Sequence, residues 1–236
     1  MGLHLDPLDA ICPKAPALAL SYQRPILVKP QGPGARRALR QCVTEIIYLQ
    51  QLLWYSRYMK DFGIWFQDLS SKPLPGAVAA AAVSAAMGAA LIAKATRITL
   101  QRQGLDSATR VALRSLWELA DRQQAVLIDL ADADERAYRA VLEAGSLPES
   151  SSARLAAWLQ ATHTPIRLAE TCLALLEAAR PLLNTCWPAV CPDPEIGVWL
   201  LETGLRAGLA AAEGNIGSCA DAPETHALQR RIDALK

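Results

Sequence analysis

Residues 73–100 read PLPGAVAAAAVSAAMGAALIAKATRITL, a Pro-Gly start followed by a long run built almost wholly of Ala and Gly. Because Ala is the best helix former, the run predicts one long α-helix. Each Ala buries far less apolar surface than a Leu, so such a helix must gain its value from close contact with neighbouring helices or with a ligand. The Pro75-Gly76 start is therefore the natural place to look for a site.

The rest of the chain also has helical patterns. Helices are predicted at about 107–144, 152–183, 195–216 and 224–235, and the first of them has Asp106 and Gly145 as capping signals at its two ends. Pro165 lies inside the second and should kink or divide it. Hydrophobic residues make up 52% of the chain with only 6% aromatic, and an excess of Ala and Leu favours helices over strands. The fold class predicted is all-α, a bundle of long antiparallel helices.

Two regions are expected. Residues 1–58 combine a proline-rich arm up to about residue 34 with the start of an amphipathic helix at 35–61, suited to packing or dimerisation, and their role is unknown. Residues 59–236 form the predicted helical domain.

Composition narrows the classes of partner. The 24 basic and 23 acidic residues give a net charge of +1, which indicates neither a nucleic acid nor an anionic membrane as partner. The first residues show no targeting signal, and the six cysteines are scattered without a CxxC pair, so neither a metal site nor a disulfide framework is expected. A cytoplasmic protein with reduced thiols is the expectation. A membrane span over 76–93 is the less favoured alternative, because the run is poor in Leu, Ile and Phe and is followed closely by Lys94 and Arg97.

Asp134 is the most informative single residue. It shares one helix face with four apolar or aromatic residues, Leu127, Ala131, Tyr138 and Val141. Burial of a carboxyl group raises its pKa, as a general acid or base at neutral pH requires. The alternative is a structural carboxylate that caps or bridges a neighbouring helix. Asp132 lies on a different face of the same helix.

The predicted helix at 195–216 carries a second polar residue on a packing stripe. Asn215 follows Leu201, Leu205, Gly208 and Ala212 on one face. A buried Asn can orient a ligand or a water molecule, or it can simply tie two helices together.

Several segments, taken in order, resemble the cyclodeaminase/cyclohydrolase family, which comprises formiminotetrahydrofolate cyclodeaminase domains and methenyltetrahydrofolate cyclohydrolases. The resemblance covers about residues 60–235 and is carried by the 73–100 run and by LADADERAYRAVLEAGSLP, TPIRLAETCLALLEAA and EIGVWLLETGLRAGLAAAEGN. The most specific match is an Asp-x-Asp pattern and the residues after it: Asp132, Asp134, Ala137, Tyr138, Val141, Ala144, Leu147 and Pro148.

The resemblance implies a homodimer of all-helical subunits, with the small face of the Ala-rich helix as the subunit seam. It also implies a folate substrate bound near the helix start and no metal or redox cofactor. The site residues it implies are Asp134 as acid/base, Asp132 and Glu195 as secondary carboxylates, Lys72, Pro75 and Gly76 as pterin or glutamate-tail contacts, and Asn215 as an orienting group. Lys72 as a solvated loop residue and Glu195 as a complement to the helix dipole are the plainer alternatives.

The chain departs from the family at the helix start, where the family pattern Pro-Gly-Gly-Gly-Ser is replaced by Pro75, Gly76, Ala77, Val78 and Ala79. Since Ala and Val should partly block a ligand's approach to the backbone, three hypotheses stay open. They are a folate cyclohydrolase or cyclodeaminase, a catalytically silent family member acting as a binding or regulatory scaffold, and an unrelated helical interaction or membrane-associated protein.

Overall fold

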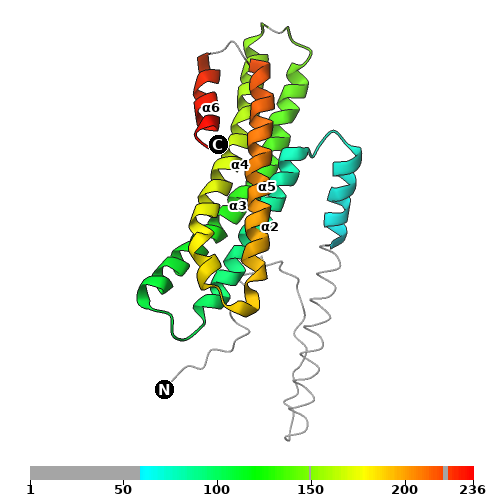
Figure 1. Ribbon diagram of the computed structural model, residues 1–236. Helices are drawn as coiled ribbons and strands as arrows, with labels where there is room; N and C mark the ends of the chain where they lie inside the picture. Colours follow the sequence, from blue (N-terminus) through cyan, green and yellow to red (C-terminus); the bar gives the residue numbers. More distant parts are fainter. Residues whose placement is uncertain (1–58, 149, 220–222) are drawn as a thin grey trace, which may run out of the picture. The chain divides into compact units, whose positions relative to one another are not determined.

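The computed structural model describes residues 59–148, 150–219 and 223–236, so the predicted arm at 1–58 lies outside the described residues. The described part is helical and contains no strand, which confirms the all-α prediction. Four long helices run antiparallel to one another (Figure 1). Residues 59–71 are helical as well, and the other elements are α2 (Ala77–Leu100), α3 (Ser107–Ala144), α4 (Ser152–Thr185), α5 (Pro192–Ile216) and α6 (Pro223–Asp233), with 3-10 turns at Pro188–Val190 and Gly217–Cys219.

The caps of α3 are those that the sequence predicts. The Asp106 carboxylate accepts hydrogen bonds from the Thr109 backbone N–H at 2.8 Å and from the Thr109 hydroxyl at 2.7 Å, and Gly145 follows the last helical residue. Helix α5 begins at Pro192, three residues before the predicted start, because a proline in the first turn needs no hydrogen-bonded N–H.

Pro165 was predicted to kink or divide its helix, and division is wrong, since α4 runs unbroken from Ser152 to Thr185. Proline has no N–H to donate to the carbonyl group four residues earlier, which here belongs to Ala161. The side-chain amide of Asn215 on α5 donates to that carbonyl oxygen at 3.0 Å. A neighbouring helix thus supplies the hydrogen bond that Pro165 cannot make.

Close packing of small residues holds α2 between α3 and α5. A Cβ atom built on Gly88 of α2 would lie 2.7 Å from the carbonyl oxygen of Gly197 on α5, so the two backbones touch there. The small residues buried along α2 include Ala81, Ala82, Ala85, Ala86, Ala89 and Ala93. These alanines of the small face, which the resemblance implied as the subunit seam, are therefore used for packing within one chain.

By length and apolar composition α2 is the one helix in the described residues that could cross a membrane. Its most apolar window is 56% buried inside the bundle, and Ala82, Ala85 and Ala89 are fully enclosed. A helix surrounded by protein side chains in this way behaves as the core of a bundle.

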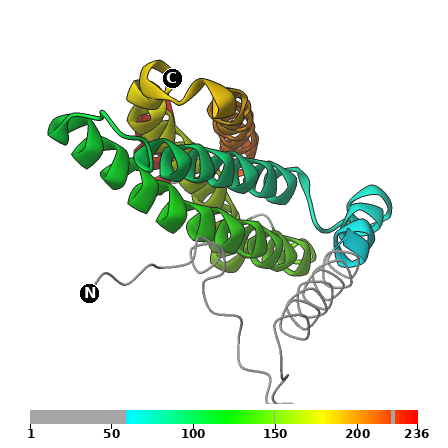
Figure 2. The same ribbon diagram turned by 90° about the horizontal axis from the view of Figure 1, so that it is seen from below.

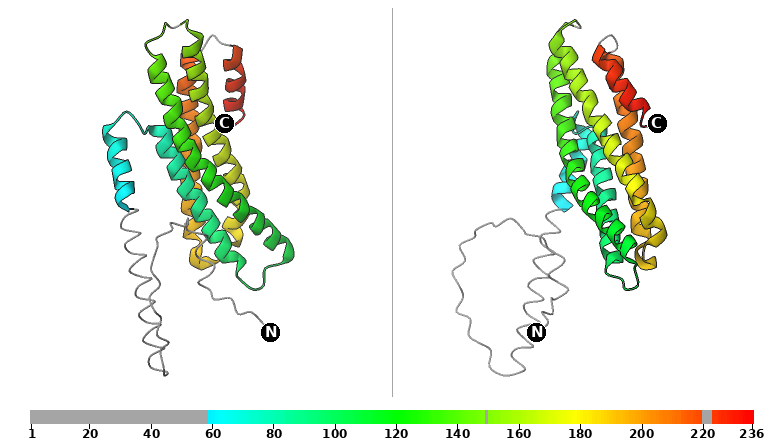
Figure 3. Two further views of the ribbon diagram at one scale, coloured as in Figure 1. Left: turned by 180° about the vertical axis from the view of Figure 1, so that it is seen from behind. Right: turned by 90° about the vertical axis from the view of Figure 1, so that its left-hand side faces the viewer.

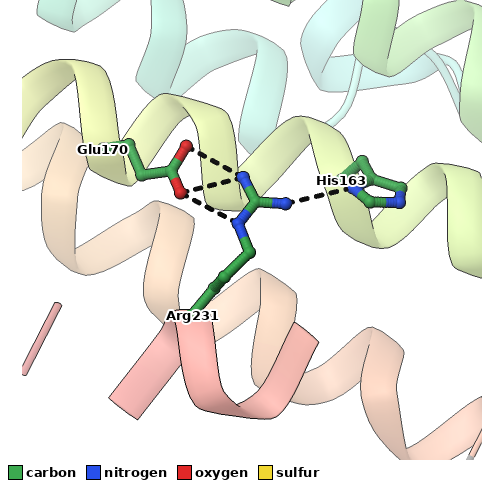
Figure 4. Close-up of polar contacts among 3 residues, drawn as sticks. All are labelled: His163, Glu170 and Arg231. Carbon is green, nitrogen blue, oxygen red and sulfur yellow. Dashed lines mark hydrogen bonds and ion pairs between the residues drawn. The ribbon is translucent and has the colours of Figure 1, made fainter. Parts of the chain in front are cut away.

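Helix α6 is attached to the bundle by apolar and polar contacts. Leu228 and Ile232 pack with Ile166 of α4 and Ala212 of α5. Arg231 forms a fork with the Glu170 carboxylate at 2.8–3.0 Å and lies 3.3 Å from His163 Nδ1 (Figure 4). Burial, and then the positive charge of Arg231, lower the pKa of His163, so the ring accepts a hydrogen bond in its neutral form.

Helices α3, α4 and α5 continue past the level at which α2 begins (Figures 1 and 3). The first turn of α2 therefore lies against the last third of α3, short of the end of the bundle. This arrangement brings the start of the Ala-rich helix to Asp134.

Candidate active site

The site is formed where the first turn of α2 meets the last third of α3, at Asp134. The first N–H groups of a helix have no partner within the helix, and the residue at the N-cap of α2, Gly76, has no side chain to offer them. The carboxylate of Asp134 on α3 accepts a hydrogen bond from the backbone N–H of Ala79. Asp134 Oδ2 lies 3.9 Å from the point where a Cβ atom of Gly76 would stand. The two features that the sequence singled out separately are therefore adjacent in space.

Asp134 has a pKa suited to proton transfer near neutrality. Burial raises the pKa of its carboxyl group from 3.8 to about 6, and the Ala79 N–H opposes the rise. The side chain is only half-buried, so a small molecule in solution can reach the carboxyl group. Around pH 6 both the acid and its conjugate base are present in quantity, as proton donation and proton removal require.

Gly76 leaves space beside this carboxylate. Its backbone is extended, with φ −101° and ψ −171°, a conformation that any residue adopts, so its glycine is not required by backbone geometry. What the missing side chain provides is an open approach to Asp134 and to the first N–H groups of α2.

The side chains that replace the family's glycines and serine point largely elsewhere. Val78 and Ala79 are buried in the main hydrophobic core, and only Ala77 of the three is exposed. The expected obstruction of the helix start is thus limited, because two of the three added side chains fill the bundle interior.

Three more of the predicted residues lie near this site in the sequence. Asp132 is exposed on α3. Lys72 precedes Gly76 by four residues, is exposed, and pairs through its ammonium group with Asp68 at 2.8 Å. Pro75 directly precedes the N-cap and is half-buried. Of these residues, Pro75 is the one that directly adjoins the N-cap of α2.

Glu195 is far from Asp134 within one chain. It stands on α5 between Asp193, whose carboxylate pairs with Lys94 of α2 at 2.9 Å, and Gly197, which packs on Gly88. Those α2 residues are 18 and 12 positions beyond Gly76, or about 27 and 18 Å along the helix axis. The structure of one chain does not bring Glu195 to the site.

Asn215 is also committed elsewhere, because its amide is bonded to the Ala161 carbonyl oxygen on α4. This contact corresponds to the helix-tying alternative for the residue. The Ala79 N–H is the group that sequence reasoning missed, since no side chain marks it. Among the described residues, no three His, Cys, Asp or Glu side chains are grouped in a way that could hold a metal ion.

Comparison with known proteins gives the family. The model of the formiminotransferase-cyclodeaminase family matches residues 65–234, so the chain belongs to that family. It is 32% identical over 175 residues to formimidoyltransferase-cyclodeaminase of Sus scrofa, a match that covers 70% of this chain and 32% of the relative. It is 29% identical over 145 residues to methenyltetrahydrofolate cyclohydrolase of Methylorubrum extorquens, covering 58% of this chain and 69% of that protein.

A solved structure shares the fold. Formiminotetrahydrofolate cyclodeaminase of Thermotoga maritima superposes with a TM-score of 0.66 at 20% identity, covering 72% of this chain and 85% of that one. The chain spans about a quarter to a third of the length of the mammalian relatives it matches. The family resemblance expected from the sequence is confirmed.

Proposed function

We propose that this protein processes a one-carbon derivative of tetrahydrofolate at the start of α2, with Asp134 as the acid/base group. The observation that carries the proposal is the half-buried Asp134 carboxyl group, with a pKa of about 6, beside the open Gly76 position. The names of the relatives, a cyclodeaminase and a cyclohydrolase, supply the two candidate reactions. Pro75 and Gly76 form the wall against which the folate is proposed to lie, and Lys72 could reach its glutamate tail only by leaving Asp68.

In cyclohydrolysis, water attacks the methenyl carbon of methenyltetrahydrofolate. Ionised Asp134 takes a proton from that water as the C–O bond forms, and it returns the proton to the ring nitrogen as the C–N bond breaks. The hydroxyl group left on the carbon loses its proton to solvent as it becomes the formyl C=O. The unpartnered N–H groups of the first turn of α2 can hold the oxygen of the tetrahedral intermediate. For this reaction Asp134 must begin as the base.

In cyclodeamination, the neighbouring folate amine attacks the formimino carbon and ammonia leaves. Asp134 then begins as the acid and protonates the departing nitrogen. The same carboxyl group therefore serves either reaction, and the pH dependence of the rate tells them apart. A base gives a rate that rises as the pH increases through about 6, and an acid gives a rate that falls.

The test uses the full chain with each substrate in turn, following methenyltetrahydrofolate by its absorbance and formiminotetrahydrofolate by ammonia release. One of the two should be consumed well above the uncatalysed rate, and Asp134→Asn should lower kcat/KM by about 10²–10⁴-fold. The matched control is Asp129→Asn, an exposed carboxylate on the same helix, which should leave the rate unchanged. Background turnover of both substrates, together with no folate binding by calorimetry, would refute the proposal.

The homodimer and the cytoplasmic location are also proposals. A dimer would give Glu195 a route to a site, because a partner subunit could present it to Asp134 although its own chain does not. Asp132→Asn and Glu195→Gln, assayed beside Asp134→Asn, test whether these secondary carboxylates take part. The silent-scaffold alternative is the less favoured one, since the acid/base group and the open position beside it are both present.

A further inference from the structure

The turn between α4 and α5 contains two free thiols. Cys186 follows the last residue of α4, Cys191 precedes the first residue of α5, and the 3-10 turn Pro188–Val190 lies between them. The turn is at the end of the bundle where α2 ends, and in Figure 2 it is the gold segment that joins the yellow and orange helices. The proposed folate chemistry uses neither thiol.

The turn brings the two sulfur atoms together. Cys186 Sγ lies 3.6 Å and Cys191 Sγ 3.5 Å from the same atom, the carbonyl oxygen of Trp187. Cys191 Sγ is also 3.5 Å from the carbonyl oxygen of Cys186 itself, and the two thiols are within hydrogen-bonding reach of each other. Two cysteines on one short turn, with both sulfur atoms at the same carbonyl oxygen, are neighbours of the kind that a disulfide joins.

The end of α2 holds this turn in place. The Trp187 backbone N–H donates to the Thr99 hydroxyl at 3.3 Å, and that hydroxyl is 3.9 Å from Cys186 Sγ. The Arg102 guanidinium stands over the Trp187 ring, 4.5 Å from its centre. Contacts from Thr99 and Arg102 thus fix Trp187, whose carbonyl oxygen both thiols approach.

The two thiols differ in access to solvent. Cys186 is buried and Cys191 is half-buried. Burial, and then the neighbouring Cys191 thiol, raise the pKa of Cys186 to about 11. Cys191 is therefore the thiol that meets an external reagent first, and Cys186 is the one that follows.

We propose that Cys186 and Cys191 form a thiol–disulfide exchange site, at which a low-molecular-weight disulfide such as oxidised glutathione converts the pair into an intramolecular disulfide. The Cys191 thiolate attacks one sulfur of the reagent, forming a mixed disulfide and releasing one glutathione thiol. Cys186, as thiolate, attacks the Cys191 sulfur and displaces the second glutathione. The two protein sulfurs are oxidised by two electrons, the reagent is reduced by two, and the two thiol protons end on the two glutathione molecules.

Peptide mapping of the full chain tests the site. The protein is incubated with oxidised glutathione under native conditions, quenched in acid, alkylated in denaturant and cleaved after Glu. Cleavage after Glu177 and Glu195 releases residues 178–195, which contain Cys186 and Cys191 and no other cysteine. The result expected is this peptide without alkyl groups and lighter by two hydrogens, and it should take up two alkyl groups after reduction.

Two variants separate the steps. In Cys186→Ser the reaction should stop with one glutathione on Cys191, and in Cys191→Ser residue 186 should stay unmodified while the chain is folded. Recovery of the doubly alkylated peptide from oxidised wild-type protein would overturn the proposal. A disulfide between Cys191 and Cys12 or Cys42 would also overturn it. The same holds if the reaction of wild-type protein ends at the mixed disulfide with glutathione. Because the wild-type map carries the test, a variant that fails to fold does not remove it.

Discussion

The hydrogen bond from Asn215 to the Ala161 carbonyl should be needed only because residue 165 is a proline. Asn215→Ala leaves that carbonyl, already without its helical donor, unpaired in a largely buried position. An unsatisfied buried carbonyl costs about 1–3 kcal/mol, and the half-buried position of Asn215 puts the expected loss at about 1–2 kcal/mol. For a chain of this length, that corresponds to a fall in Tm of about 2–8 °C.

Pro165→Ala supplies the second arm of a double-mutant cycle. An alanine at this position has a backbone N–H that can donate to Ala161 in the ordinary helical way, so Asn215→Ala in that background should cost less than about 0.5 kcal/mol. The coupling energy between the two substitutions is then about 1 kcal/mol. It is obtained from urea unfolding of the four proteins followed by far-UV circular dichroism.

Asn215→Asp adds a check on the direction of the bond. It replaces the donor amide with a carboxylate oxygen facing a carbonyl oxygen, and it should destabilise the protein more than Asn215→Ala does. Equal losses from Asn215→Ala in the wild-type and Pro165→Ala backgrounds would refute the reasoning, because the bond would then be independent of the proline.

Gly76→Ala adds a methyl group 3.9 Å from Asp134 Oδ2, so KM for the folate should rise; an unchanged KM would place the ligand elsewhere. Folding stability should change by less than about 1 kcal/mol, because Ala is a poorer N-cap than Gly but lowers the entropy of the unfolded chain. Because the native pKa of Asp134 lies above its unfolded value, native protein binds the extra proton between about pH 4 and 6, and stability falls as pH rises through that window. Asp134→Asn should remove this dependence of the free energy of unfolding on pH, which is measured by urea unfolding at several pH values. The same pH dependence in wild-type protein and variant would contradict the prediction. Gly88→Ala places a Cβ 2.7 Å from the Gly197 carbonyl oxygen and should cost about 1–3 kcal/mol by thermal unfolding. The control Gly214→Ala, with open space around its Cβ position, should cost nothing.

Local patterns predicted the helices well because each carries its own signals. Asp106 and Gly145 mark the ends of α3, and the Ala-rich run of α2 allows little except a helix. The fate of Pro165 could not be predicted locally. The group that compensates for it, Asn215, is 50 positions away and reaches Ala161 only after α4 and α5 have packed.

The candidate site was predicted in its parts and not in its geometry. The helical stripe indicated that Asp134 would be buried, and the Pro75-Gly76 start suggested a ligand. That the Ala79 N–H would face this carboxylate depends on the register between α2 and α3, which no side-chain pattern encodes. The same limit applies to Glu195, because its separation from the site follows from the level at which α5 packs on α2.

The spacing of Cys186 and Cys191 in the sequence could have predicted that the two thiols are neighbours. The scatter of the cysteines along the chain indicated no framework, yet Cys186 and Cys191 flank a Trp-Pro turn that reverses the chain. Such a turn brings residues five positions apart together, so the spacing could have predicted the pair.

The most direct test of the role given to Asp134 is the pH profile of kcat/KM for wild-type protein and Asp134→Asn, measured with whichever folate is consumed. The wild-type profile should bend at about pH 6, where the Asp134 carboxyl group titrates, and the ratio of wild-type to variant rates should follow the same bend. A ratio close to one at every pH would show that Asp134 takes no part in proton transfer and would contradict the account.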